Sequence, residues 1–209
     1  MRPKPPSAPV SRKLVAFDFD GTLTYKDSFT AFLKAMCGSA RIAKALTFKP
    51  DMLFNYLKTK DRGALKSQLL YSLLGPISQE ELETEIKAFV TRTGMSLYRA
   101  DALKAWEDHD LPDRMRVIVT ASPDLLVRPF GELIGADRVI GTRLGFSADG
   151  RLMRDLNGAN CRGPEKVRRI KEIFGQSPEL ISAYGDTSGD TEMLALAEKS
   201  YYRVFKAKP

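Results

Sequence analysis

One stretch of the sequence decides the fold that we expect, KLVAFDFDGTLT at residues 13–24. It begins with a short apolar run that ends at Asp18, as a buried parallel strand does at its carboxyl end. Asp18 and Asp20 are two positions apart, so both carboxylates project from the same side of an extended chain. Gly21 then lets the backbone turn sharply toward a ligand. Because carboxylates this close repel unless a cation or a proton separates them, the stretch predicts a functional strand end rather than a simple turn.

The chain beyond residue 110 alternates strands and helices. A second apolar strand is expected from Met115 to Ser122, and a helix follows from about Pro123, since proline favours the first helical turn. Further strands are expected at 139–140, within 142–152 around a hairpin turn at Asp149-Gly150, at 179–184 and at 201–205, and further helices at 164–174 and near 190–198. This alternation predicts an α/β protein with a parallel sheet.

Residues 27–110 interrupt this pattern directly after the first strand. Apolar residues there recur at helical spacing, and glycine and proline divide the block into about five helices. Two stripes illustrate the spacing: Phe29, Phe32, Leu33 and Met36, and Met52, Leu53, Tyr56 and Leu57. Gly38 is one of the dividing residues, and Ser78 with Glu81 predicts a capping box for a helix that runs to about Arg92. We expect a disordered proline-rich lead-in at 1–12, a catalytic core at 13–26 and 111–209, and a helical cap at 27–110.

Composition narrows the classes of protein. The 209 residues carry a formal net charge of +7, and no apolar run approaches the ~18 residues of a membrane span. Two cysteines, Cys37 and Cys161, argue against a disulfide framework and for a reducing cytoplasm. Within 31–75, eight basic and two acidic residues give +6, so this segment holds nearly all of the excess charge. Such a segment suits nucleic acid, an anionic membrane or an anionic substrate, or is a solvated face.

The single histidine excludes several catalytic classes. The only histidine is His109, so a cluster of histidines cannot bind zinc. A lone general base stays open, but the charged surroundings of His109 favour an ordinary surface residue. The cysteine phosphatase pattern requires Arg six positions after Cys. It fails because Ala43 follows Cys37 and Val167 follows Cys161 at that spacing. The chemistry must therefore rest on carboxylates, hydroxyls, lysine and a hard metal ion.

Three more segments lie where a predicted strand ends or a helix begins, which is where open α/β sheets bind ligands. Thr120-Ala121-Ser122 offers a hydroxyl and backbone N–H groups for a phosphate, although the segment taken alone favours a simple helix N-cap. Lys166 lies at a helix start, where the helix dipole disfavours a cation unless an anion is near. Asp186 and Asp190 follow a strand in a glycine-containing loop. Carboxylates of this kind suit Mg²⁺, although an ordinary strand–helix loop is the alternative.

In this order, the four segments resemble the motifs of the haloacid dehalogenase (HAD) superfamily of phosphatases, which implies a Rossmann-like sheet. The helical insertion after the first motif is similar to the phosphoserine phosphatase-like subgroup. The resemblance implies that Asp18 attacks phosphorus and forms an aspartyl-phosphate, and that Asp20 acts as acid and base. It also implies Mg²⁺ held by Asp18, the Asp20 carbonyl and Asp186.

The resemblance assigns the remaining site residues as well. Thr120 and the amide of Ala121 would bind phosphate oxygens. Lys166 would neutralise charge on the nucleophile and the phosphate, and Asp190 would orient Lys166 or metal-bound water.

The substrate is less clear from the sequence. Phosphoserine phosphatases commonly carry Ser, Glu and Asn where this chain has Gly21, Asp27 and Gly189. The run Asp27-Ser28-Phe29-Thr30-Ala31-Phe32-Leu33 is more similar to bacterial phosphatidylglycerophosphate phosphatases, and we expect Asp27 to contact substrate. A lipid substrate would give the basic cap a role at the inner face of the membrane, although the cap shows no clear membrane-seeking segment.

Two other classes stay open. One is a phosphatase for phosphoserine or a similar soluble phosphomonoester, with the basic cap gripping the substrate. The other is a binding protein that kept the fold but not the activity, which the complete set of carboxylates and the lysine disfavours. Nucleic-acid binding is disfavoured too, because no pattern of base-stacking aromatic residues accompanies the lysines.

Overall fold

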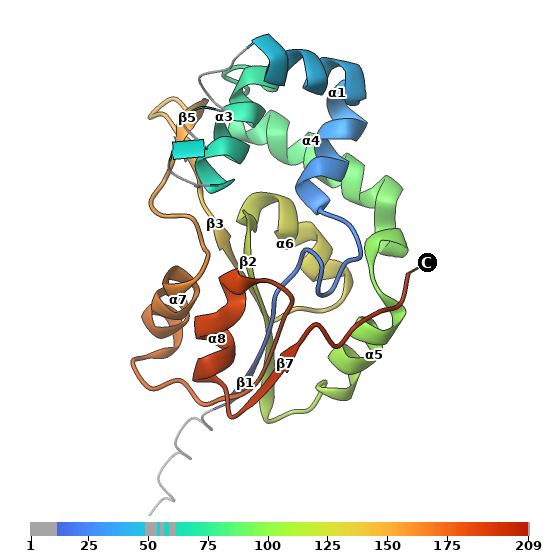
Figure 1. Ribbon diagram of the computed structural model, residues 1–209, viewed down its shortest axis with the longest axis vertical. Coiled ribbons are helices and arrows are strands. Elements are labelled where there is room, and N and C mark those ends of the chain that lie inside the picture. Colours follow the sequence, from blue (N-terminus) through green and yellow to red (C-terminus); the bar gives the residue numbers. More distant parts are fainter. Residues whose placement is uncertain (1–11, 49–53, 55–56, 59–61, 209) are drawn as a thin grey trace, which may run out of the picture.

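A five-stranded parallel sheet forms the centre of the computed structural model, which describes residues 12–48, 54, 57–58 and 62–208 (Figure 1). The strands lie in the order β3-β2-β1-β6-β7, and each neighbouring pair is parallel. Their bounds are β1 Lys13–Phe17, β2 Arg114–Pro123, β3 Arg138–Thr142, β6 Leu180–Gly185 and β7 Lys199–Tyr202. This sheet with its helices confirms the predicted α/β, Rossmann-like fold. The expected strand at 201–205 lies earlier, in β7.

Helices cover both faces of the sheet because successive residues of its strands point to opposite sides. Val15 and Phe17 of β1 belong to a cluster with side chains of α5 (Ala100–Asp108) and α6 (Asp124–Leu133). Leu14 and Ala16 belong to a second cluster with α7 (Pro164–Phe174) and α8 (Thr191–Leu196). The sheet is therefore buried between two helical layers, as its almost continuous apolar strands predict.

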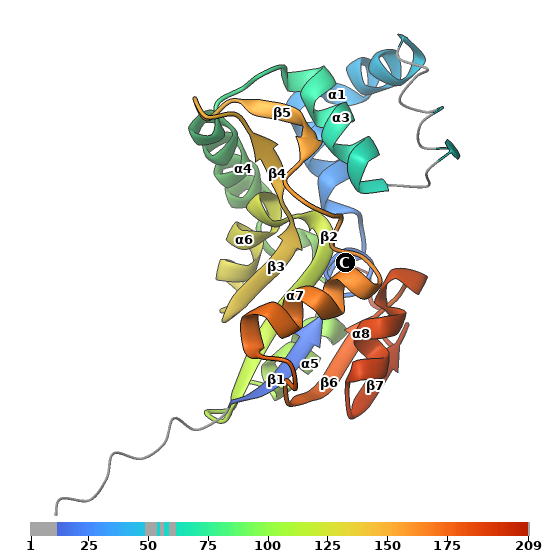
Figure 2. The same ribbon diagram turned by 90° about the vertical axis from the view of Figure 1, so that its left-hand side faces the viewer.

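Apart from the short 3₁₀ helix η2 (Ser188–Asp190) after β6, the remaining helices lie beyond the carboxyl ends of the strands (Figures 1 and 2). They are α1 (Ser28–Phe48), α3 (Arg62–Leu74), α4 (Gln79–Thr93) and the short 3₁₀ helix η1 (Gly94–Leu97). The capping box at Ser78 and Glu81 is confirmed at the start of α4. Gly38 divides the helical segment as predicted, because its φ of 74° and ψ of 154° are non-helical and separate α1 into two arms that meet at a kink. In the described part of the chain, every helix is too short or too polar to cross a bilayer.

Two packing relationships cross the predicted limits of the cap. Trp106 of α5 packs edge-on against Phe17 of β1, with ring centroids 5.1 Å apart. The antiparallel pair β4 (Leu144–Phe146) and β5 (Leu152–Leu156) turns at Asp149-Gly150 as predicted, and β5 packs against α3. The limits at 26/27 and 110/111 stay a prediction. The lead-in at 1–11 and Met52, Leu53 and Tyr56 of the predicted stripe lie outside the described residues.

The prediction that His109 is an ordinary surface residue is wrong. Its ring is half-buried, with Nδ1 2.7 Å from Arg114 Nη1 and Nε2 2.9 Å from the Tyr184 hydroxyl. Burial, followed by the charge of Arg114, lowers the pKa of His109 below its ordinary value. The charged neighbours in its segment concealed the aromatic partners, Phe17 and Tyr184, that strands β1 and β6 supply.

Candidate active site

The predicted site residues gather at the carboxyl edge of the sheet, facing the cap. One cavity of about 140 Å³ is lined by most of them: Asp18, Asp20, Asp27, Thr120, Ala121, Lys166 and Asp190. Asp186 is next to this cavity, because its carboxylate lies within 4.8 Å of those of Asp18 and Asp190. Residues from β1, β2, α7 and the loop after β6 meet here because parallel strands end at the same edge. The structure therefore brings all eight predicted residues into one region.

Asp18, Lys166 and Asp190 form a buried ion triad. Lys166 Nζ lies 2.7 Å from Asp18 Oδ1 and 2.6 Å from Asp190 Oδ1. Lys166 and Asp190 are each 1% exposed, and Asp18 is 7% exposed. A third bond, of 2.5 Å, runs from Lys166 Nζ to the carbonyl of Val119, so all three ammonium protons have acceptors. Burial lowers the pKa of Lys166, but the charges of Asp18 and Asp190 outweigh it and keep this lysine charged.

The local structure of α7 explains how a lysine at a helix start is tolerated. Gly163 has φ 61° and Pro164 is the first residue of α7, so Lys166 lies in the first turn of this helix. A cation there opposes the helix dipole by a few tenths of a kcal/mol. The carboxylates of Asp18 and Asp190 are the anionic partners that we expected from the sequence. Their attraction for Lys166 outweighs this small cost.

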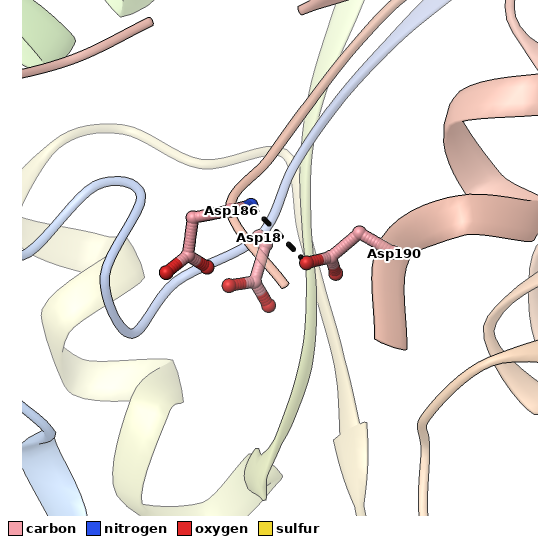
Figure 3. A group of neighbouring side chains, drawn as sticks. All are labelled: Asp18, Asp186 and Asp190. Carbon is pink, nitrogen blue, oxygen red and sulfur yellow. Dashed lines mark hydrogen bonds between the residues drawn. The ribbon is translucent and has the colours of Figure 1, made fainter. Parts of the chain in front are cut away.

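Without a further cation, the carboxylate of Asp18 is readily protonated. Burial raises its pKa to about 7, with Lys166 acting in the opposite direction. Burial and then the charge of Asp190 raise the pKa of Asp186 as well. The two carboxylates lie 4.8 Å or less apart, and both have raised pKa values (Figure 3). A divalent cation bound between them would stabilise their charged forms.

Asp190 is engaged by the protein itself. One of its oxygens accepts from Lys166, and the other accepts from the amides of Asp186 and Thr187 and from the Thr187 hydroxyl. Figure 3 shows the bond to the Asp186 amide. By contrast, Asp186 Oδ1 accepts one long bond of 3.4 Å from Thr22. The donor set therefore fits a cation held by Asp18 and Asp186, with Asp190 in a supporting position.

Two glycines make room for these carboxylates. A Cβ on Gly21 would lie 2.3 Å from Asp186 Oδ2, and Gly21 also has φ +89°. A Cβ on Gly185 would lie 2.5 Å from the Cβ of Asp190. The loop after β6 can therefore approach the first motif only with glycine at these positions.

Asp20 points away from the triad, toward the cap. Its Oδ1 accepts the amide of Ser28 at 2.6 Å, and its Oδ2 accepts the hydroxyl of Ser122 at 2.5 Å. Burial, followed by the charge of Asp27, raises its pKa. A half-buried carboxyl with a raised pKa is suited to carry a proton to or from a ligand in the cavity.

Thr120 and Ala121 lie on the wall of the cavity, within β2 rather than at a helix start. Strand β2 continues to Pro123, and α6 begins at Asp124 without a side-chain cap. The alternative interpretation of this segment as a helix N-cap is therefore wrong. The Thr120 hydroxyl, 1% exposed as a residue, accepts the amide of Ser122 at 3.1 Å.

Asp27 and an unpredicted residue, Lys66, connect the cap to the core. Lys66 Nζ of α3 lies 3.0 Å from Asp27 Oδ2 and 3.1 Å from Ser122 Oγ. Burial raises the pKa of Asp27, but Lys66 and the amide of Thr30 hold it below the ordinary value. Nothing in the local sequence marks Lys66, which is one of 33 basic residues. Asn160 and Arg162 also line the cavity without having been predicted as site residues.

The fold places several carboxylates and one buried lysine together at a sheet edge that faces the helical cap. The model of the haloacid dehalogenase-like hydrolase family matches residues 15–195. The chain belongs to this family, and it is a HAD-type phosphatase, as predicted.

The chain is also similar to named relatives and to solved structures. The chain is 48% identical over 196 residues to Protein CicA of Caulobacter vibrioides, covering 94% of this chain and 88% of that one. It is 35% identical to the inhibition of morphological differentiation protein of Streptomyces azureus, covering 88% and 68%. A solved phosphoserine phosphatase with bound substrate shares the fold at a TM-score of 0.60 and 20% identity, covering 91% and 85%. The resemblance to phosphatidylglycerophosphate phosphatases stays a prediction.

Proposed function

We propose that this protein is a Mg²⁺-dependent phosphomonoester hydrolase that forms an aspartyl-phosphate on Asp18 and acts on a phospholipid head group such as phosphatidylglycerophosphate. The observation that carries the chemistry is the group of Asp18, Asp186 and Asp190, whose carboxylates lie within 4.8 Å of one another. Asp18 and Asp190 are buried and share the ammonium of Lys166, whereas Asp186 is half-buried. Asp18, Asp186 and the backbone carbonyl of Asp20 would hold the ion. Bound there, Mg²⁺ would offset the negative charge of the carboxylates and of a phosphate oxygen.

In the first step, an oxygen of Asp18 attacks phosphorus while the bond from phosphorus to the substrate alcohol oxygen breaks. Asp20 gives its proton to the departing alcohol, consistent with its raised pKa. In the second step, Asp20 takes a proton from water, and the resulting hydroxide oxygen bonds to phosphorus and releases Asp18. Phosphate leaves, and both side chains return to their starting states.

The neighbouring side chains support these steps by position and charge. Lys166, bonded to Asp18, would neutralise charge on the nucleophile and on the phosphate. Asp190 fixes Lys166 from the other side. Thr120 and the amide of Ala121 would contact phosphate oxygens, and Asp27 would contact the leaving group.

The lipid part of the proposal rests on the outer surface of the cap. Three large apolar side chains are mostly exposed there: Phe48 (74%), Phe54 (69%) and Leu57 (62%). They are the apolar groups for membrane contact that the sequence did not make obvious. Lys44 lies over the ring of Phe48, with Nζ 5.8 Å from its centroid, and Lys58 follows Leu57. Exposed apolar side chains beside lysines are typical of a surface that rests on anionic lipid. We place the enzyme in the cytoplasm, at the inner face of the membrane.

A second candidate is a soluble zwitterionic phosphomonoester such as phosphoserine. The pair of Asp27 and Lys66 favours it, because a carboxylate and an ammonium at the cavity can bind an amino and a carboxyl group. A histidinol-phosphatase of Neisseria meningitidis, 22% identical over 180 residues, is a relative whose named substrate carries an amino group.

The deciding experiment measures Mg²⁺-dependent phosphate release from phosphatidylglycerophosphate in mixed micelles and from phosphoserine, with Asp18→Asn as the blank. Release from the lipid alone supports the proposal, and preference for phosphoserine supports the second candidate. Cosedimentation with vesicles containing anionic lipid tests the surface separately. The variant Leu57→Ser should bind less, whereas Leu111→Ser, at an exposed leucine outside the cap surface, is the matched control. Equal binding of both variants would contradict the assigned surface.

A further inference from the structure

The bend in α1 opens a groove that the chemistry described above does not use. The first arm, residues 28–37, and the second arm, residues 39–48, meet at Gly38 (Figure 1). A cavity of about 310 Å³ lies against both arms and α3. Its apolar lining consists of Phe29 and Leu33 from the first arm, Ile42, Ala43 and Leu46 from the second arm, and Leu69 from α3.

The groove is next to the active-site cavity. Lys66 lines that cavity and bonds to Asp27, and its ammonium also lies 5.2 Å from the ring centroid of Phe29, which lines the groove. Leu69 follows Lys66 by three positions on α3, so both lie on the same side of that helix. A ligand whose phosphate lies beside Asp18 can therefore extend past Lys66, so that the rest of the molecule contacts the apolar lining of the groove.

The polarity of the two cavities changes abruptly at Lys66. Carboxylates, lysines and hydroxyls line the active-site cavity, whereas aliphatic and aromatic side chains dominate the groove. Lys34 also lines the groove and is exposed, which places a cation at its rim. A ligand that complements this arrangement carries an anionic head and an apolar chain. An apolar hollow open to water is costly unless a ligand covers it.

We propose that the groove holds the hydrocarbon chain of the phosphomonoester whose phosphate occupies the Asp18 cavity. This inference rests on the proposed lipid function, and it assigns the residues that bind the hydrocarbon chain of the substrate. Phe29, Leu33, Ile42 and Leu69 contact the methylene groups, and Lys66 marks the boundary between head and chain. Gly38 is required because its backbone at the bend, with φ 74° and ψ 154°, lies in a region that strains any other residue.

The test measures kcat/KM for a series of n-alkyl monophosphates, from ethyl to decyl, below their critical micelle concentrations. In the native protein, each methylene that enters the groove should raise kcat/KM about two- to fourfold. The variant Ala43→Trp fills the groove and should abolish this dependence while leaving turnover of the ethyl ester unchanged. Ala35→Trp is the matched control, because Ala35 is an exposed alanine of the same helix that does not line the groove.

The outcomes separate this inference from the proposed function. Chain-length dependence that persists in Ala43→Trp overturns the groove assignment and leaves a lipid substrate in place. A native enzyme that hydrolyses all chain lengths equally overturns both the groove and the lipid substrate, but not the phosphatase. If Ala43→Trp instead changes the oligomeric state without changing chain-length dependence, the groove is an interface between copies, and the proposal is wrong. Turnover of the ethyl ester and thermal unfolding show that each variant is folded.

Discussion

Lys166 Nζ lies 2.7 Å from Oδ1 of Asp18, although the two residues are 148 positions apart in the sequence. The same ammonium lies 2.6 Å from Asp190 Oδ1, so one buried cation serves two buried carboxylates. With Asp186 close by, the negative charge at this strand end exceeds the positive charge of its lysine. This imbalance is the physical reason for expecting a further cation, and it leads to the first two predictions.

Replacing Lys166 with Met should lower both activity and stability. The two carboxylates would lose their buried partner, which costs about 3–5 kcal/mol of unfolding free energy. Loss of the charge beside the reacting phosphate should lower kcat by about 10³-fold. Chemical denaturation and steady-state kinetics measure the two effects. Lys171→Met on the same helix α7 is the control, and an equal effect of both variants would show that Lys166 has no special role.

Binding of Mg²⁺ should release protons near neutral pH. Without the ion, burial raises the pKa of Asp18 to about 7, so its carboxyl is partly protonated there. A divalent cation favours the carboxylate, so on the order of half a proton should leave at pH 7, and none well above it. Titration calorimetry in buffers of different ionisation enthalpy measures this release. A release that does not decline above pH 8 would contradict the assignment.

The same raised pKa predicts how the metal-free protein responds to pH. A carboxyl whose folded pKa lies above its unfolded value contributes stability below the unfolded pKa. For Asp18 this contribution is complete below about pH 3.8 and is lost as the pH rises through about 7. Saturating Mg²⁺ should remove this loss. The measurement is the difference in unfolding free energy between native protein and Asp18→Asn, with and without the ion, across this range.

Gly21→Ala should weaken metal binding specifically. Its new Cβ would lie 2.3 Å from Asp186 Oδ2, so the carboxylate must move, in addition to backbone strain at φ +89°. Gly150→Ala is a matched control, because Gly150 has φ +73° and no atom within 4 Å of its Cβ position. Both variants should lose about 1–2 kcal/mol from strain. We expect only Gly21→Ala to raise the Mg²⁺ dissociation constant, by tenfold or more, as calorimetry would measure.

His109 should make the protein less stable as the pH falls. Arg114 has no acceptor, so it donates to Nδ1 and leaves the neutral ring to donate from Nε2 to Tyr184. Because the folded pKa lies below the unfolded value, the unfolded chain takes up the proton first as pH falls below about 6.5. His109→Gln should flatten the decline in unfolding free energy between about pH 7.5 and pH 5.5. A decline of the same slope in the variant would contradict this role.

Local patterns in the sequence determined much of this protein. The apolar run before Asp18, the strand–helix alternation after residue 110 and the capping box at Ser78 are short-range signals, and each was confirmed. They work because strand burial, turns and caps depend on residues a few positions apart. The four motifs also indicated the site residues, since parallel strands end at a common edge.

The tertiary structure decided what depends on distant segments. Lys66 reaches Ser122 across 56 positions, and no local feature distinguishes it from other lysines of the cap. The half-buried ring of His109 and the groove beside Phe29 depend likewise on elements brought together by folding. Residue type and spacing report a helix or a strand end, but the partner of a side chain is fixed only when the elements pack. The sequence by itself therefore determined the class of chemistry, whereas the packing of the cap decided which side chains line the two cavities beside it.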